Sequence, residues 1–201
     1  MDEIIVDAVG EVCPKPVILT KTELDKISSG TVKTKVDDDI CVENIKRYAE
    51  GQGYDFDFKQ TDYGFETTVV KKEGQASEVE GKVTKNVNNG KLVVAISTDT
   101  MGKGDEKLGE KLAKSFIYSM SETDPAPDTL IFYNSGIKFT TEGSEVLDDL
   151  KKLEEKGTTI MTCGTCLDYY EKKDQLAIGV VSNMYEIYEQ LSQADRNIII
   201  R

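Results

Sequence analysis

A polar stretch divides this chain into two halves with different patterns of strands and helices. Residues 73–90 begin with Glu73-Gly74-Gln75, end with Asn88-Asn89-Gly90 and have no sustained apolar period, which is typical of a linker. The 201 residues of the chain are enough for two small domains. We therefore predict a first domain over residues 1–72, a linker over residues 73–90 and a second domain over residues 91–201.

The first half alternates strands with helices and ends in the pattern of a hairpin. The predicted elements are a strand over Glu3–Val9, a helix over Pro14–Ile27, a strand over Thr31–Val36, a helix over Ile40–Gln52, and strands over Tyr54–Gln60 and Phe65–Lys72. Asp62-Tyr63-Gly64 supplies the turn between the last two strands. This βαβαββ order predicts a small two-layer α/β sandwich with both helices on one face of the sheet.

The second half has continuous apolar strands separated by helices. The predicted elements are strand Lys91–Ser97, helix Asp105–Met120, strand Thr129–Tyr133, helix Ser144–Lys156, strands Thr158–Thr162 and Ala177–Val181, helix Met184–Ala194 and strand Asn197–Ile200. In the first of these helices we expect Leu108, Leu112, Phe116 and Ile117 to face inward. Apolar strands of this kind are typical of a parallel sheet covered on both faces. We predict a three-layer α/β/α domain with a mostly parallel sheet.

The composition excludes several classes of function. The chain has no histidine, which rules out Cys-His and Ser-His catalysis and imidazole metal ligands. A net charge of -12, from 25 Lys+Arg and 37 Asp+Glu, argues against direct binding of nucleic acid. No segment approaches the roughly 20 apolar residues that span a bilayer, and no secretory signal is recognisable. We therefore expect a cytoplasmic protein without membrane contact, whose four cysteines are reduced.

Cys13 stands directly before Pro14 and Pro16. Because proline favours the first turn of a helix, this order predicts Cys13 at the N-cap. The helix dipole and the charge of Lys15 would both favour the thiolate, which is the nucleophilic form of cysteine. The backbone N–H of Lys15 is the donor best placed to hold the sulfur. We interpret Cys13 as reactive, the alternative being a buried cysteine that happens to precede a helix.

Cys163 and Cys166 form a C-x-x-C pair between a predicted strand and a helix. A zinc site needs four ligands, and the other cysteines, Cys13 and Cys41, are singly placed. A thioredoxin-type dithiol, a persulfide on one cysteine with the other resolving it, and two merely packed thiols all remain open. We predict no metal and no cofactor. Cys41 is interpreted as a core residue.

The carboxyl ends of parallel strands meet at one rim of the sheet, where sites collect. Asn134, Ser135 and Gly136 follow one predicted strand of the second half, and Cys163 follows the next. We therefore expect Asn134, Ser135 and Gly136 to line a substrate pocket beside Cys163 and Cys166.

Each half of the chain resembles a known protein family. Asp7-Ala8-Val9-Gly10-Glu11-Val12-Cys13-Pro14-Lys15-Pro16 resembles the opening of the TusA (SirA-like) sulfur-carrier family, whose hallmark is Cys-Pro-x-Pro, and the resemblance covers roughly residues 3–71. It implies that Cys13 carries a persulfide from a cysteine desulfurase to an acceptor. The second half resembles the DsrE family of sulfur-transfer proteins at Ile160-Met161-Thr162-Cys163, Thr98–Asp105 and Asn134-Ser135-Gly136. By position, this resemblance implies that Cys163 is the active cysteine and Cys166 the additional one.

The order of the two halves, together with Cys-Gly-Thr-Cys-Leu-Asp-Tyr-Tyr, resembles the YedF proteins, which are described as sulfurtransferase-like and linked to selenium metabolism. We therefore predict a sulfur or selenium relay between Cys13 and Cys163, in which Lys15 stabilises the anion and Cys166 releases the cargo. The implied partners are a cysteine desulfurase or other donor protein and a downstream acceptor protein. The DsrE resemblance further implies a homo-oligomer through the second domain. The alternatives are a dithiol oxidoreductase that uses Cys163 and Cys166, and a non-catalytic regulator that senses sulfur or selenium.

Overall fold

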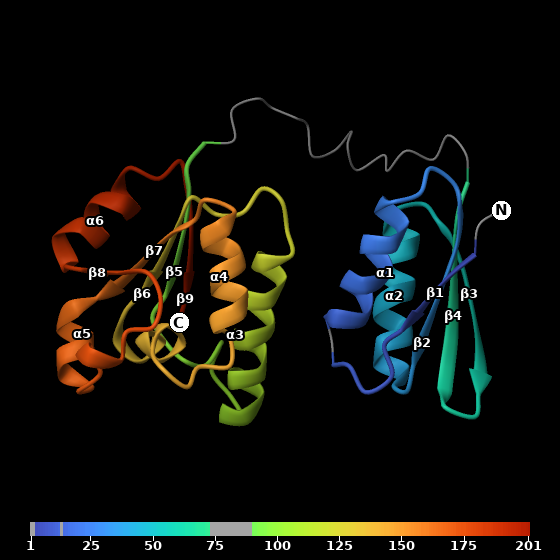
Figure 1. Cartoon of the computed structure of the whole chain (residues 1–201), viewed down its shortest axis with the longest axis horizontal. Coiled ribbons are helices and arrows are strands. Elements are labelled where there is room, and N and C mark those ends of the chain that lie inside the picture. The colour runs from blue at the N-terminus through green and yellow to red at the C-terminus, as the bar shows by residue number, and fades with distance from the viewer. Residues whose placement is uncertain (1–2, 13, 73–89) are drawn as a thin grey trace. The chain divides into compact units, whose positions relative to one another are not determined.

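The computed structural model describes residues 3–12, 14–72 and 90–201. Cys13 and all of the predicted linker except Gly90 lie outside the described residues. The chain divides into two compact units, Met1–Asn88 and Asn89–Arg201 (Figure 1). Within the described ranges, no helix has the length and apolar character that crossing a membrane requires.

The first unit is a four-stranded sheet with two helices. Its elements are β1 (Glu3–Asp7), α1 (Lys15–Asp25), β2 (Gly30–Val36), α2 (Asp39–Gly51), β3 (Asp55–Thr61) and β4 (Gly64–Lys71). The sheet order is β1-β2-β4-β3, with β1 and β2 parallel and the other pairs antiparallel. Both helices lie on one face of the sheet (Figure 1). The predicted two-layer α/β sandwich is confirmed.

The core of the first unit follows from the alternation of β2. Val32, Thr34 and Val36 are buried on one face of the strand, while the lysines between them lie on the other. The buried hydroxyl of Thr34 meets that of Thr20 on α1 at 2.7 Å, so neither oxygen lacks a partner. Cys41 on α2 is 3% exposed and belongs to this core, as predicted.

The second unit is a five-stranded sheet. Its strands are β5 (Leu92–Ile96), β6 (Thr129–Phe132), β7 (Thr159–Cys163), β8 (Val180–Ser182) and β9 (Arg196–Ile200). Its helices are α3 (Glu106–Ser121), η2 (Asn134–Thr140), α4 (Leu147–Glu155), α5 (Gly164–Tyr169), η3 (Lys173–Gln175) and α6 (Met184–Ser192). The order is β8-β7-β6-β5-β9, and every neighbouring pair is parallel. The short helix η2 forms where the sequence pattern predicts a loop.

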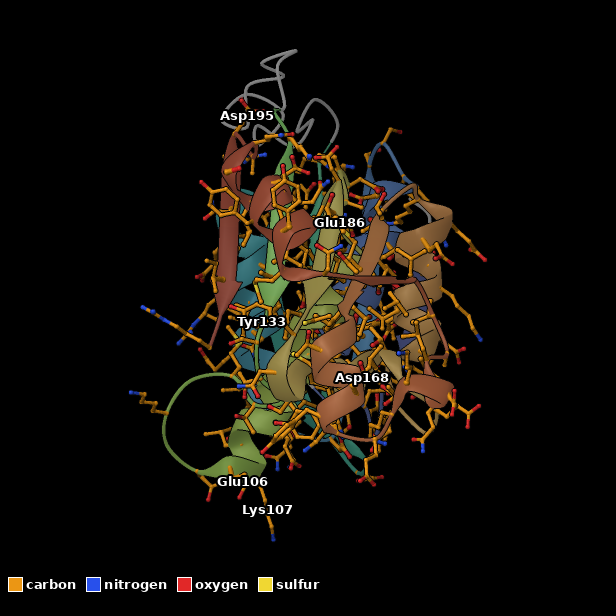
Figure 2. All side chains as sticks on the ribbon, turned by 90° about the vertical axis from the view of Figure 1, so that its left-hand side faces the viewer. Glu106, Lys107, Tyr133, Asp168, Glu186 and Asp195 are labelled. Carbon is orange, nitrogen blue, oxygen red and sulfur yellow. The ribbon has the colours of Figure 1, made fainter. Side chains whose placement is uncertain are left out.

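Helices cover both faces of this sheet. On one face α3 and α4 pack over a cluster that includes Leu130 and Phe132. On the other face a second cluster includes Ile131, Met161 and Ile187 of α6. Figure 2 shows α5, which carries Asp168, and α6, which carries Glu186, on the near side of the strands. The predicted three-layer α/β/α domain with a parallel sheet is confirmed.

The buried face of α3 differs from the prediction. Leu108 and Leu112 were expected to face inward, but their side chains are 55% and 45% exposed. The row that packs inward is instead Gly109, Ala113, Ile117 and Ser121. A Cβ on Gly109 would come within 3.0 Å of the Thr100 side chain. Small residues allow this close approach of α3, and a pattern that counts large apolar residues misses it.

Replacement by alanine is expected to destabilise the protein by different amounts on the two faces of α3. Ile117 is fully buried, so Ile117→Ala is expected to lower the free energy of unfolding by about 2–5 kcal/mol. Leu112→Ala, on the exposed face of the same helix, is expected to cost only about 0.5 kcal/mol. Urea denaturation of the full chain, followed by circular dichroism, measures both. Equal losses for the two variants would contradict the assigned face.

Candidate functional site

The first candidate site surrounds the segment before α1. Cys13 itself lies outside the described residues, but its flanks are described. The N-cap of α1 is Pro14 and the helix begins at Lys15, so the predicted N-cap position of Cys13 is wrong by one residue. The backbone N–H of Lys15 donates to the Val12 carbonyl at 3.1 Å, which closes a turn ahead of the helix. The N–H predicted to hold the sulfur is therefore already bonded to a carbonyl.

The side chain of Lys15 is also bonded. Its ammonium lies 2.8 Å from the Glu11 carboxylate, and both side chains are about half exposed. A paired and partly solvated ammonium contributes little net field to a neighbouring thiol. The charge that the sequence assigned to activation of Cys13 is thus largely compensated within the same segment.

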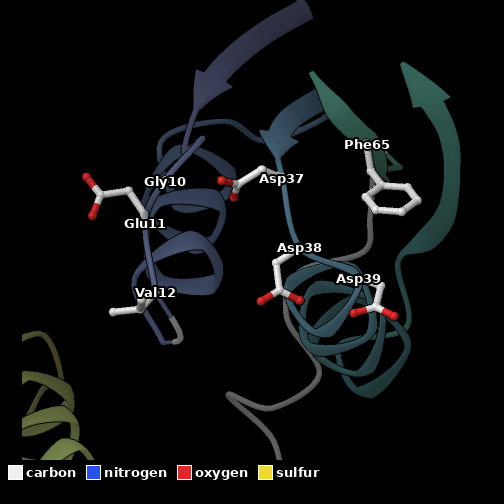
Figure 3. A pocket seen from close by; sticks show the side chains of 7 residues that line it. All are labelled: Gly10, Glu11, Val12, Asp37, Asp38, Asp39 and Phe65. Carbon is white, nitrogen blue, oxygen red and sulfur yellow. The ribbon is translucent and has the colours of Figure 1, made fainter. Parts of the chain in front are cut away.

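An acidic hollow of about 550 Å³ adjoins this segment. Gly10, Glu11 and Val12 form one side, and Asp37, Asp38 and Asp39 with Phe65 form the other (Figure 3). The Asp38 carboxylate caps α2 by accepting the N–H of Ile40 at 2.7 Å. Among the residues that the structure describes, no cluster of three or more Cys, Asp or Glu side chains is arranged to hold a metal ion. The surroundings of this segment are therefore anionic.

The second candidate site joins β7 to α5. Cys163 ends β7 and is 1% exposed, whereas Cys166 in α5 is partly exposed. Both are free thiols, and Cys166 packs against the apolar cluster to which Cys163 belongs. Gly164 and Thr165 separate them, and a Cβ on Gly164 would lie 2.9 Å from the Val181 side chain. The two sulfurs therefore form an adjacent pair, one buried and one reachable.

The loop after β6 holds the reachable sulfur. The backbone N–H of Asn134 donates to the Cys166 Sγ at 3.0 Å. Asn134 has a φ of 50°, the left-handed conformation that asparagine tolerates better than most residues. The Tyr170 hydroxyl donates to the Asn134 Oδ1 at 3.0 Å. One residue thus connects the Cys166 sulfur to the Tyr170 side chain.

Burial of the sulfur raises the pKa of the Cys166 thiol above its usual value. The hydrogen bond from the Asn134 N–H lowers this pKa in opposition, and the neighbouring Cys163 raises it again. Because burial prevails, the thiolate fraction of Cys166 at neutral pH is smaller than that of an exposed cysteine. Cys166 therefore rests mainly as a thiol.

Asp99 ties the same loop to the end of β5. Its carboxylate accepts the Ser135 hydroxyl at 2.8 Å and lies 2.6 Å from the Lys138 ammonium. Burial would raise the pKa of Asp99, but the hydrogen bonds from Lys138 and Ser135 outweigh burial and lower it. The pKa of Lys138 is raised by the same contact. This ion pair anchors the segment that presents Asn134.

The predicted lining residues therefore take different places. Asn134 contacts Cys166, the Ser135 hydroxyl donates to Asp99, and Gly136 is buried where a Cβ would collide with the Ile96 carbonyl. The sequence analysis missed Tyr170 and Lys138. Tyr170 contacts Asn134, 36 residues away, and Lys138 contacts Asp99, 39 residues away, so no local spacing in the sequence marks either residue.

Comparison with known proteins agrees with this division of the chain. The model of the DsrE/DsrF-like family matches residues 91–199. The chain belongs to the DsrE/DsrF-like family. The model described as "Sulfurtransferase TusA" matches residues 4–72, so a TusA/SirA-like domain precedes the DsrE/DsrF-like domain. Both family resemblances seen in the sequence are confirmed, while the likeness to YedF proteins stays a prediction.

Several individual proteins are similar to parts of the chain. The putative sulfur carrier protein MJ0990 of Methanocaldococcus jannaschii is 43% identical over 49 residues, which are 24% of this chain. The match spans 65% of that relative's length. A SirA-like protein from Desulfitobacterium hafniense is 41% identical, with 35% of this chain and 99% of that chain covered and a TM-score of 0.34. The ychN protein from E. coli is 16% identical, with 55% and 99% covered and a TM-score of 0.44.

The raised pKa of Cys166 predicts a specific pH profile of alkylation. In the folded chain the rate at which iodoacetamide modifies Cys166 is expected to be several times lower at pH 7 than in the chain unfolded in urea, because less thiolate is present. The folded rate is expected to keep rising at pH values where the unfolded rate has levelled off. Tandem mass spectrometry of the peptide that holds both cysteines measures each rate. A folded profile that levels off at or below the unfolded one would contradict the shift.

Proposed function

We propose that the protein is a sulfur or selenium relay, in which Cys13 and the Cys163–Cys166 pair exchange a sulfane sulfur or a selenium atom. The observation that carries the proposal is the union, in one chain, of a TusA-like domain and a DsrE/DsrF-like domain that holds Cys163 and Cys166 in one cluster. The resemblance to YedF proteins adds selenium as a cargo. In this role the protein is a sulfurtransferase-like carrier.

The transfer step needs no external oxidant or reductant. A thiolate of the pair attacks the outer sulfur of a persulfide on Cys13 and a new S–S bond forms. The S–S bond at Cys13 breaks, and Cys13 leaves as a thiolate that takes up the proton released by the attacking thiol. Transfer in the opposite direction follows the same course. The raised pKa of Cys166 favours its thiol form between transfers, which limits reaction with unrelated disulfides.

The covalent connection raises the rate of this exchange. With residues 1–72 as the carrier domain and residues 91–201 as its acceptor domain, residues 73–90 form a tether of about 18 residues. Such a tether gives the two sites an effective concentration of about millimolar. A carrier loaded at Cys13 then meets the second domain far more often than it meets a separate protein at cellular concentration.

The anionic hollow beside the Cys13 segment favours partners with basic surfaces. Its carboxylates come from Glu11 and Asp37–Asp39, and next to them the side chains of Val12 and Ile40 are 76% and 61% exposed. Apolar contact surrounded by one sign of charge is typical of a transient docking surface. We propose that the donor, a cysteine desulfurase or similar protein, and the acceptor protein present lysines and arginines here.

A second candidate function is a dithiol oxidoreductase that uses Cys163 and Cys166. Cys166 packs against the cluster that holds Cys163, and this favours it, because oxidation to a disulfide requires two thiols that lie close together. In that case the first domain only docks partners. A regulator that binds sulfur or selenium without passing it on would load with the same cysteines but show no turnover.

The second domain also supports self-association. Tyr185 and Tyr188 on α6 are 69% and 67% exposed, and Val180 on the edge strand β8 is 55% exposed. Exposed aromatic side chains beside an unpaired strand edge favour association with another chain. We propose a homo-oligomer formed through this face.

The relay predicts where cargo accumulates. After incubation of the full chain with a cysteine desulfurase and cysteine, intact mass spectrometry is expected to show added sulfur. Peptide mapping is expected to find it on Cys13 and, in Cys163→Ala, where the second thiol cannot displace it, also on Cys166. Cys13→Ala is expected to lose both, because loading proceeds through Cys13. The double variant Cys163→Ala/Cys166→Ala is expected to retain sulfur on Cys13 alone. A parallel incubation with selenide tests the second cargo.

Cys41→Ala is the matched control. This variant is expected to leave sulfur loading unchanged, because Cys41 is buried in the core. Absence of added sulfur on the wild-type chain would contradict the relay. Disulfide-reductase activity that survives in Cys13→Ala would instead favour the dithiol oxidoreductase.

Self-association predicts a concentration-dependent mass in sedimentation equilibrium. Tyr188→Lys is expected to lower that mass toward the monomer, because it places a charge in the apolar face. Leu112→Lys, at a comparably exposed apolar residue on α3, is expected to leave the mass unchanged. A wild-type chain that is monomeric at all concentrations would contradict the proposal.

A further inference from the structure

The two thiols of the second domain differ in how a reagent reaches them. Cys163 is 1% exposed and lies in the apolar cluster with Ile131, Met161 and Ile187. Cys166 is partly exposed, and its sulfur is the one that accepts the Asn134 N–H. Thiol–disulfide and persulfide exchange require access to the attacking sulfur. A protein donor therefore reaches Cys166 before it reaches Cys163.

We propose that Cys166 is the thiol that reacts first, that Cys163 acts afterwards as the buried resolving thiol, and that Tyr170 is a positioning residue that sets the Cys166 sulfur through Asn134. This order is the reverse of the one implied by the family resemblance, which assigned the active role to Cys163. The inference deepens the proposed function and rests on it for the nature of the cargo.

The positioning role follows from a chain of hydrogen bonds. The Tyr170 hydroxyl donates to the Asn134 Oδ1, and this contact fixes the side chain of a residue with a left-handed backbone. Such a conformation persists only where its surroundings hold it. Held in this way, Asn134 directs its N–H at the Cys166 Sγ, where it stabilises the developing thiolate.

The charged side chains near the Cys166 sulfur influence it less than the Asn134 N–H does. Lys138 is paired with Asp99 at 2.6 Å, so its charge is compensated. The titratable group that acts on the pKa of Cys166 is the Cys163 thiol, which raises it. The hydrogen bond from the Asn134 N–H therefore distinguishes Cys166 from an ordinary buried thiol. Tyr170 holds Asn134 in the position that makes this bond.

In the proposed reaction, sulfur passes from the donor to Cys166, and the two thiols are then oxidised to a disulfide. The Cys166 thiolate attacks the outer sulfur of a persulfide donor, an S–S bond forms on Cys166, and the donor leaves as a thiolate. The Cys163 thiolate then attacks the Cys166 Sγ, which forms the Cys163–Cys166 disulfide and releases hydrosulfide. The outer sulfur gains the two electrons that the dithiol loses, and both thiol protons pass to solvent or to the leaving groups. A dithiol reductant restores the pair.

The order of the two thiols is tested with an aromatic disulfide, which releases a coloured thiolate. The full chain carries Cys13→Ser, so that the reaction reports the second domain. The intact pair is expected to release two thiolates and to end as an internal disulfide. Cys163→Ala is expected to release one thiolate and to keep the label on Cys166. Cys166→Ala is expected to lose labelling over the time in which Cys166 reacts to completion. Labelling of Cys163 in Cys166→Ala that is as fast as labelling of Cys166 in Cys163→Ala would overturn the order.

The positioning role is tested by the pH profile of Cys166 alkylation. Tyr170→Phe is expected to slow the reaction at neutral pH by about three- to tenfold and to move the profile to higher pH, because the N–H that stabilises the thiolate is released. Tyr169→Phe is the matched control. Tyr169 is 81% exposed and packs edge-on against Tyr170. Removal of its hydroxyl is expected to leave the rate and the pH profile of Cys166 alkylation unchanged. An equal shift in both variants would overturn the role of Tyr170.

Asn134→Gly supplies a second measurement. Glycine adopts the left-handed backbone readily and has no side chain to anchor. We therefore expect Tyr170→Phe to have no further effect in the Asn134→Gly background, as a double-mutant cycle reveals. Additive shifts would overturn the route through Asn134. Neither measurement uses sulfur cargo, so failure of the relay and failure of this inference remain distinguishable.

Discussion

Parallel strands place all of their carboxyl ends at one edge, and the site in the second domain depends on this constraint. The loop after β6 and the helix after β7 leave the sheet side by side because β6 and β7 pair in parallel. The Asn134 N–H therefore meets the Cys166 sulfur at 3.0 Å, although 32 residues separate them. Asp99, at the end of β5, holds the same loop through Ser135 and Lys138.

A chain without histidine needs other means to control its thiols. In the second domain the control comes from burial and from one backbone N–H, which act on the pKa of Cys166 in opposite directions. In the first domain Lys15 is paired with Glu11, and the neighbouring hollow is acidic. Burial thus favours the thiol form of Cys166, which suits a sulfur carrier more than it suits a strong nucleophile.

Much of the architecture could be predicted because strand and helix periodicity reports which side of an element is buried. The βαβαββ order and the parallel second sheet were both predictable. The inward face of α3 was not, because Gly109 and Ala113 make the close contact and their small size conceals them from a hydrophobic pattern. Tyr170 was missed for a different reason, because its contact with Asn134 joins distant parts of the sequence. Its role depends on the conformation of a loop that lies far away in the sequence.

The sequence by itself determined the two α/β domains, the family of each and the cysteines available for chemistry. These follow from local patterns and short motifs, which are readable without knowledge of distant contacts. Only the tertiary structure decided that Cys163 is buried and Cys166 reachable, that Lys15 is paired, and that Asn134 links Cys166 to Tyr170. Each of these depends on burial or on a hydrogen bond between particular atoms, and such contacts exist only once the elements have packed.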